Sequence, residues 1–131
     1  MIRPLAFALV FALPATVAWA DPHSDCDQTA DPDRQISGCT LVIETDPKHV
    51  KAYFNRGAAY YKKRDFDRAI ADFSKTIELR PNHAADYINR GVAFAVKGDK
   101  NRASADFRKA LKIDPSNESA KKGLEMLGMT L

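Results

Sequence analysis

The sequence has little net charge, which argues against several kinds of partner. Its 131 residues hold 20 lysines and arginines against 17 aspartates and glutamates, a formal charge of +3 at pH 7. A nucleic-acid-binding domain concentrates far more positive charge on one face. The densest basic run, Lys62-Lys63-Arg64, lies where a helix is expected to end, and cations there offset the helix dipole. We therefore expect neither nucleic acid nor an acidic substrate as the partner.

The sequence also has no apolar run long enough to span a bilayer. The most apolar segment, residues 5–20, falls short of the roughly 20 residues that a spanning helix needs. Arg3 precedes it, and Ala18 and Ala20 supply the small side chains that a signal peptidase recognises. This pattern predicts a signal peptide over 1–20, cleaved after Ala20, and a periplasmic or secreted mature chain without membrane insertion. An uncleaved membrane anchor is the alternative.

No catalytic motif is present. The chain contains no GxSxG, no HExxH and no glycine-rich phosphate loop. His49 and His83 follow a proline at the same position of a repeat described below. Their similar surroundings therefore reflect the repeat and do not indicate a catalytic site. Cys39 is conceivable as a nucleophile, but in an exported chain with one other cysteine a structural role explains it better. We expect a protein that is not an enzyme and that uses no cofactor.

The chain has only two cysteines, Cys26 and Cys39. Both lie in the part expected to be exported, where an oxidising compartment favours pairing, so we predict one disulfide. Closing this loop contributes about 3 kcal/mol on the chain-entropy view. A metal site formed by Cys26 with His23, Asp25 and Asp27 is the alternative. These side chains are too crowded and too acidic for tetrahedral coordination, so no metal is predicted.

The sequence contains two consecutive copies of a 34-residue unit, at 48–81 and 82–115. The two copies are identical at 15 of 34 positions. The identities include Tyr53/Tyr87, Asn55/Asn89, Arg56/Arg90, Gly57/Gly91, Ala69/Ala103, Asp72/Asp106, Phe73/Phe107 and Pro81/Pro115. A period of this length with helical spacing predicts stacked helical hairpins.

The apolar spacing divides each unit into two helices, 48–63 and 66–79 in the first, with 82–97 opening the second. Gly57 and Ala69 are small, which lets two helix backbones approach closely where they cross.

Residues on either side of the two units complete the expected solenoid. Asp31-Pro32-Asp33 begins a helix over 33–45 that keeps the repeat register, so residues 21–47 are expected to be a disulfide-linked extension and half a repeat whose first helix is missing. Residues 116–131 are expected to form a C-terminal capping helix, begun by Ser116 or Asn117, that covers the last stacking face.

At these positions the two units resemble tetratricopeptide repeats (TPR), over 68 of 131 residues. The matching residues are Tyr53, Gly57, Tyr60, Ala69, Phe73 and Pro81 in the first unit, and Tyr87, Gly91, Phe94, Gly98, Ala103, Phe107, Ala110 and Pro115 in the second. The resemblance implies an all-α, right-handed α-solenoid of antiparallel helical hairpins, as in a small exported bacterial TPR protein. It also implies a concave groove, lined by the first helices, that binds peptides or partner proteins.

The chain departs from the family pattern at several positions. Arg64 replaces the usual loop glycine, Thr76 replaces an alanine, and Arg56 and Arg90 stand where leucine is common. A charge near a hairpin interface needs a partner.

Aspartates recur on the second helices, so we predict the pairs Arg56 with Asp72 and Arg90 with Asp106, or a cross-repeat pair of Arg90 with Asp72. Independent solvated charges are the alternative.

Each first helix carries a second apolar stripe, on nearly the opposite side from the first. In the TPR register these positions resemble the concave-face set, and two asparagine amides beside them could bond a peptide backbone. The predicted partner-binding residues are Phe54, Asn55, Ala58, Tyr61, Ile88, Asn89 and Val92. Relatives that clamp a C-terminal carboxylate need asparagine where this chain has Ala58 and Val92, so the resemblance implies a partly apolar segment instead. The alternative is that leading and capping helices cover the stripe and make it core.

The sequence therefore predicts a non-enzymatic scaffold that binds an extended, partly apolar peptide or partner chain. The alternative is a permanent accessory subunit of a larger envelope complex. A permanent subunit would stay with its complex through salt washes that remove a reversible adaptor.

Overall fold

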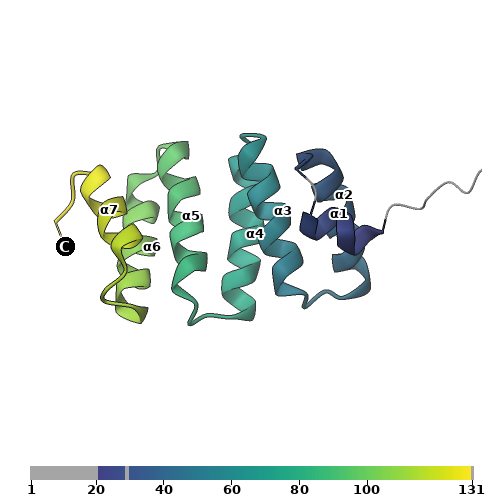
Figure 1. Cartoon of the computed structure of the whole chain (residues 1–131). Helices are drawn as coiled ribbons and strands as arrows, with labels where there is room; N and C mark the ends of the chain where they lie inside the picture. Colours follow the sequence, from purple (N-terminus) through teal and green to yellow (C-terminus); the bar gives the residue numbers. More distant parts are fainter. Residues whose placement is uncertain (1–20, 29, 131) are drawn as a thin grey trace, which may run out of the picture.

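The computed structural model describes residues 21–28 and 30–130, and the signal peptide predicted over 1–20 lies outside them. Over the described residues the chain forms seven α-helices and no strand (Figure 1). They are α1 (Pro22–Gln28), α2 (Pro32–Thr45), α3 (Val50–Lys62), α4 (Phe66–Leu79), α5 (Ala84–Lys97), α6 (Lys100–Ile113) and α7 (Glu118–Met126).

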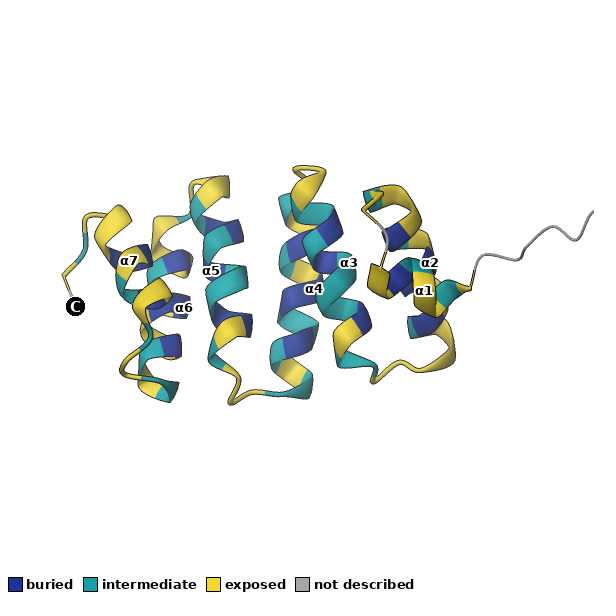
Figure 2. Ribbon diagram, in the orientation of Figure 1, coloured by how far each residue is buried: buried dark blue, intermediate teal, exposed yellow. Residues whose placement is uncertain are grey.

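The helices stand in one row, each packed against the next along the chain (Figure 1). α1 with α2, α3 with α4, and α5 with α6 form the hairpins, and α7 closes the row against α5 and α6. The predicted all-α repeat solenoid is confirmed. Buried residues lie where helices face one another, and the turns and outer faces are exposed (Figure 2).

Local capping sets the helix ends. Asp65 and Asp99 begin α4 and α6, and each side chain accepts a hydrogen bond from the backbone N–H three residues on. Gly98 ends α5 in the left-handed conformation, with a φ of 91°. α3 begins at residue 50 and not at 48, because a turn intervenes and His49 is the cap, whose Nδ1 accepts from the N–H of Ala52 at 3.1 Å.

Two phenylalanine rings close the hairpins. A Cβ on Gly57 would lie 2.9 Å from the ring of Phe73, and a Cβ on Gly91 would lie 3.0 Å from the ring of Phe107. The first distance is shorter than real Cβ contacts and the second is at that limit, so the glycines allow the ring of one helix to lie against the backbone of the other. Leu124 of α7 joins the same core and is fully buried.

The leading unit differs from the prediction. A half-repeat lacking its first helix was expected, but α1 forms a short first helix against α2 and α3. Asp21 begins it by accepting from the N–H of His23, and Pro22 occupies its first position. Cys26 is its only buried residue, so no apolar period revealed it. A Cβ on Gly38 would lie 2.8 Å from the carbonyl oxygen of Pro22, which shows how closely α1 approaches α2.

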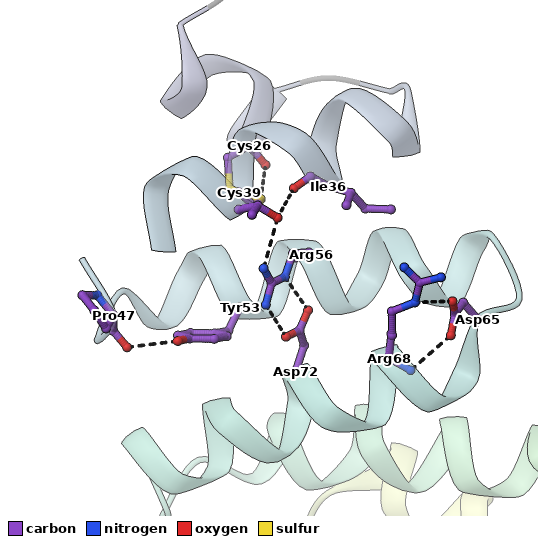
Figure 3. Close-up of polar contacts among 10 residues, drawn as sticks. Cys26, Ile36, Cys39, Pro47, Tyr53, Arg56, Asp65, Arg68 and Asp72 are labelled. Carbon is purple, nitrogen blue, oxygen red and sulfur yellow. Dashed lines mark hydrogen bonds and ion pairs between the residues drawn. A yellow bond between two sulfur atoms is a disulfide. The ribbon is translucent and has the colours of Figure 1, made fainter. Parts of the chain in front are cut away.

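The two cysteines face each other across this short hairpin. Their Cα atoms lie 4.5 Å apart and the sulfur atoms are joined (Figure 3). Both residues are buried with Val42 and Ala52, and Gln35 donates to the carbonyl oxygen of Cys26 at 3.2 Å. A helix of seven residues is marginal alone, so its position depends on these contacts and on the pairing.

We predict that Cys39→Ser lowers the free energy of unfolding by about 3 kcal/mol, because an unlinked loop gains conformational entropy when the chain unfolds. Urea denaturation of the oxidised protein measures the change, and Ser37→Ala, at an exposed position of the same helix, is the control. The predicted disulfide would be wrong if the denatured, unreduced protein titrated with two free thiols.

The predicted arginine–aspartate pairs form within each unit. Arg56 donates through Nε and Nη2 to the two carboxylate oxygens of Asp72, both at 2.8 Å (Figure 3). Arg90 makes the same two bonds to Asp106, at 2.8 and 2.7 Å. The hydrogen bond to Asp72 raises the pKa of Arg56 above its ordinary value. The cross-repeat pair of Arg90 with Asp72 does not form.

The link between units comes from a different atom of each arginine. The Nη1 of Arg56 donates to Thr40 Oγ1 of the preceding hairpin, and the Nη1 of Arg90 donates to Ser74 Oγ, both at 3.1 Å. Thr40 and Ser74 are 34 residues apart, so the bond repeats with the fold. Each guanidinium therefore joins three helices.

We predict that Arg90→Met lowers the free energy of unfolding by about 3 kcal/mol, because it leaves the carboxylate of Asp106, only 7% exposed, without its partner. The double variant Arg90→Met with Asp106→Ala should recover most of that loss, since no unpaired charge remains. Urea denaturation of the single and double variants measures the coupling. Arg102→Met, which breaks an exposed pair with Asp99, is the control and should lose much less. Equal effects of the Arg90 and Arg102 changes would contradict the prediction.

Candidate functional site

An open hollow of about 330 Å³ lies between α3 and α5. It is lined by Phe54, Ala58, Tyr61, Lys62, Phe73, Asn89 and Val92. Most of this lining is apolar, and Phe73, which comes from α4 and is 4% exposed, contributes a buried ring to it. The hollow is therefore a mainly apolar surface between two first helices.

The lining follows from helix geometry. Phe54, Ala58 and Lys62 are spaced four residues apart, which places them on one face of α3. Asn89 and Val92, three residues apart, share a face of α5. Since α3 and α5 are the first helices of consecutive units, these faces flank the same space. Ala58 is the small residue in the row on α3 and leaves room between its larger neighbours.

The aromatic rings that line the hollow pack against other aromatic rings. The rings of Phe54 and Phe73 have centroids 6.0 Å apart, and those of Tyr61 and Phe66 lie 5.4 Å apart in an edge-to-face arrangement. Phe54 and Tyr61 are half-buried against the core. A ligand would thus meet rings that are already fixed, which reduces the ordering cost of binding.

The structure brings together five of the seven residues predicted to bind a partner: Phe54, Ala58, Tyr61, Asn89 and Val92. Their role in binding stays a prediction. Ile88 lies elsewhere and packs against the core cluster that contains Phe94 and Phe107. For Ile88, the alternative interpretation as core describes the geometry better.

The side chain of Asn55, the seventh predicted residue, is hydrogen-bonded to α1. Its Nδ2 donates to the carbonyl oxygen of Cys26 and to Asp27 Oδ1, both at 3.1 Å. The carbonyls in the last turn of α1 have no helical donor, and that of Cys26 accepts from Asn55 in addition to Gln35. Lys51 adds an ion pair with Asp27 at 2.7 Å. α1 therefore covers α3 at this point, as the core alternative proposed.

Asn89 holds the equivalent position on α5 but has a different neighbour. The carbonyl that corresponds to Cys26 belongs to Tyr60, and the N–H of Asp65 already donates to it at 2.9 Å. The Asn89 side-chain amide makes no hydrogen bond within residues 21–28 and 30–130. An amide that is free beside an apolar hollow can donate to, and accept from, the backbone of a bound chain.

Two lining residues were not among the predicted binding set. Phe73 is a buried residue of the hairpin core that also lines the hollow. Lys62 was interpreted only as a cation at a helix end. Lys62 lies four residues after Ala58 and eight after Phe54, and this spacing could have placed it on the same face of the helix from the sequence alone.

Three other hollows in the described residues, of about 340 to 440 Å³, are more open and are lined mainly by charged and polar side chains. Two are formed by the turns after α3 and α5, where charged side chains predominate. Within the described ranges, no cluster of three histidine, cysteine or acidic side chains is placed to hold a metal ion. None of the helices that the structure describes is both long enough and apolar enough to cross a membrane.

Comparison with known families gives one match. The tetratricopeptide repeat model matches residues 50–83 and 84–117, which together are more than half of the chain. The search among curated proteins gave no match.

The fold is similar to several solved structures. The TPR domain of Arabidopsis OM64 is 25% identical with a TM-score of 0.74, and the match covers 82% of this chain and 88% of that one. The first TPR of Spaghetti (RPAP3), bound to the HSP90 peptide SRMEEVD, is 25% identical with a TM-score of 0.70, covering 74% and 77%. The second TPR domain of human RPAP3, in complex with the HSP70 peptide SGPTIEEVD, is 27% identical with a TM-score of 0.71, covering 76% and 82%.

Proposed function

Because the chain belongs to the tetratricopeptide repeat family, we propose that it is a non-enzymatic interaction scaffold that binds an extended, partly apolar segment of a peptide or partner chain. The hollow between α3 and α5 is the binding site. The observation that carries this proposal is the combination of an open apolar lining with the unbonded amide of Asn89. The peptides held by two of the similar structures support a peptide as the class of ligand.

The chemistry of the lining favours an apolar anchor. Phe54, Tyr61 and Val92 are each only half-buried, so a side chain inserted between them removes apolar surface from water on both partners. Burying one large aliphatic or aromatic side chain contributes about 1.5–3 kcal/mol. The surrounding rings do not move to receive it, so little of this is lost to ordering.

We predict that Ala58→Trp weakens peptide binding about tenfold or more, because the indole would fill the space between Phe54 and Tyr61 that an anchor residue needs. Ala71→Trp is the matched control, since Ala71 is exposed in α4 and does not line the hollow. Affinity is measured by fluorescence anisotropy with a peptide selected from a random decapeptide library.

Phe54→Ala with Val92→Ala should weaken the same peptide by a similar factor. Unchanged affinity in the Trp variant, or affinity unchanged in the double variant while its stability falls, would assign the stripe to the core and end the proposal.

We also propose that the protein acts outside the cytoplasm, in a periplasm or after secretion. The charged start, short apolar segment and small residues before position 21 support this location. A disulfide between the two cysteines fits an oxidising compartment.

If residues 1–20 are a signal peptide, the protein recovered from its native envelope should begin at Asp21. Intact-mass measurement distinguishes this chain from the full-length one. Replacing Ala18 and Ala20 with bulky residues should block cleavage, because the peptidase accepts only small side chains there. A full-length chain in the soluble native fraction would contradict the proposal.

A further inference from the structure

Lys62 is the one charged side chain among the residues that line the hollow. It lies at the end of α3, is exposed, and forms no ion pair within the described part of the chain. Its neighbour behaves differently: Lys63 pairs with Asp33, and the repeat equivalent Lys97 pairs with Asp67. The ammonium of Lys62 is therefore a positive charge beside an apolar surface without a matching negative charge of the protein.

The spacing along α3 relates this charge to the anchor position. Ala58, which leaves room for an anchor, and Lys62 are one helical step of four residues apart, about 6 Å along the axis. In an extended peptide, side chains two residues apart point the same way and lie about 6.6 Å apart. A peptide running along α3 with one side chain over Ala58 thus presents the side chain two positions away to Lys62.

From this arrangement, and resting on the proposed function, we infer that the bound segment carries an acidic side chain two residues from its large apolar anchor. The carboxylate pairs with the ammonium of Lys62, while the anchor lies against Phe54, Tyr61 and Phe73. Asn89, across the hollow on α5, bonds the peptide backbone between them. The recognised element is an internal side-chain carboxylate, and no free C-terminus is required.

The helix-dipole interpretation of Lys62 does not account for its place in the hollow. Lys112 serves the same dipole role in the last turn of α6 and also lacks an ion pair in the described residues, yet it does not line the hollow. A change of charge at either lysine has the same effect on a helix end. Of these two lysines, only Lys62 lines the hollow, so only its charge can change which peptides bind there.

The test is selection from a library of random decapeptides displayed as internal segments, so that no peptide has a free C-terminal carboxylate. The bait is the oxidised chain of residues 21–131. Selected sequences should carry an aromatic or large aliphatic residue with Asp or Glu two positions away. Lys62→Glu should exchange the acid for Lys or Arg at the same spacing, and Lys112→Glu should keep the wild-type preference. Replacing the acid of a selected peptide with its amide should weaken binding to the wild type about fivefold and leave binding to Lys62→Glu unweakened.

Each outcome decides the inference. Selection of apolar anchors without an acid at this spacing would overturn it while the proposed function stands, and so would an acid preference that persists in Lys62→Glu. Selection of no apolar sequence at all would overturn both. Ala58→Trp, which leaves Lys62 in place, separates the two contributions, because it should abolish anchor selection without reversing the charge preference.

Discussion

The contact between a phenylalanine ring and a glycine backbone is the constraint on which the rest of the structure depends. Phe73 closes the first full hairpin against Gly57, and Phe107 closes the second against Gly91. Phe107 also reaches the final helix, where a Cβ on Gly123 would lie 2.7 Å from its ring. Because these rings lie between neighbouring helices, they set the spacing of the row. The same ring of Phe73 lines the hollow, so the core contact and the candidate site share one side chain.

The arginine–aspartate pairs add a second link with a different function. The rings fill space without much preference for register, whereas a guanidinium that bonds both oxygens of a carboxylate permits one orientation. A third bond from each guanidinium reaches a hydroxyl on the preceding hairpin. Replacing a family leucine by arginine thus exchanges apolar packing for directional bonds, and it does so identically in both units.

The two ends of the row make the site asymmetric although the repeats are alike. α1 has only seven residues, and the carbonyl oxygen of Cys26 in its last turn accepts from the amide of Asn55 as well as from Gln35. In the next unit the equivalent carbonyl, that of Tyr60, accepts from the N–H of Asp65, and the side-chain amide of Asn89 has no hydrogen-bond partner among residues 21–28 and 30–130. α7 closes the other end against α5 and α6. The apolar stripe of the first helices lines an open hollow between α3 and α5.

The sequence by itself determined the helical hairpins, their period, the small residues at the crossings and the expectation that aspartates on the second helices pair with Arg56 and Arg90. These features are local or repeat every 34 residues, and so they can be recognised from spacing and from charge that must be matched. Only the tertiary structure decided which stripe residues face the hollow. Ile88 packs against the core, Asn55 bonds to α1, and Lys62 lines the hollow, because each outcome depends on which residues of the neighbouring helices lie opposite. α1 itself escaped detection since its position rests on Cys26 and the close approach at Gly38, contacts with α2 that no periodicity within seven residues can show.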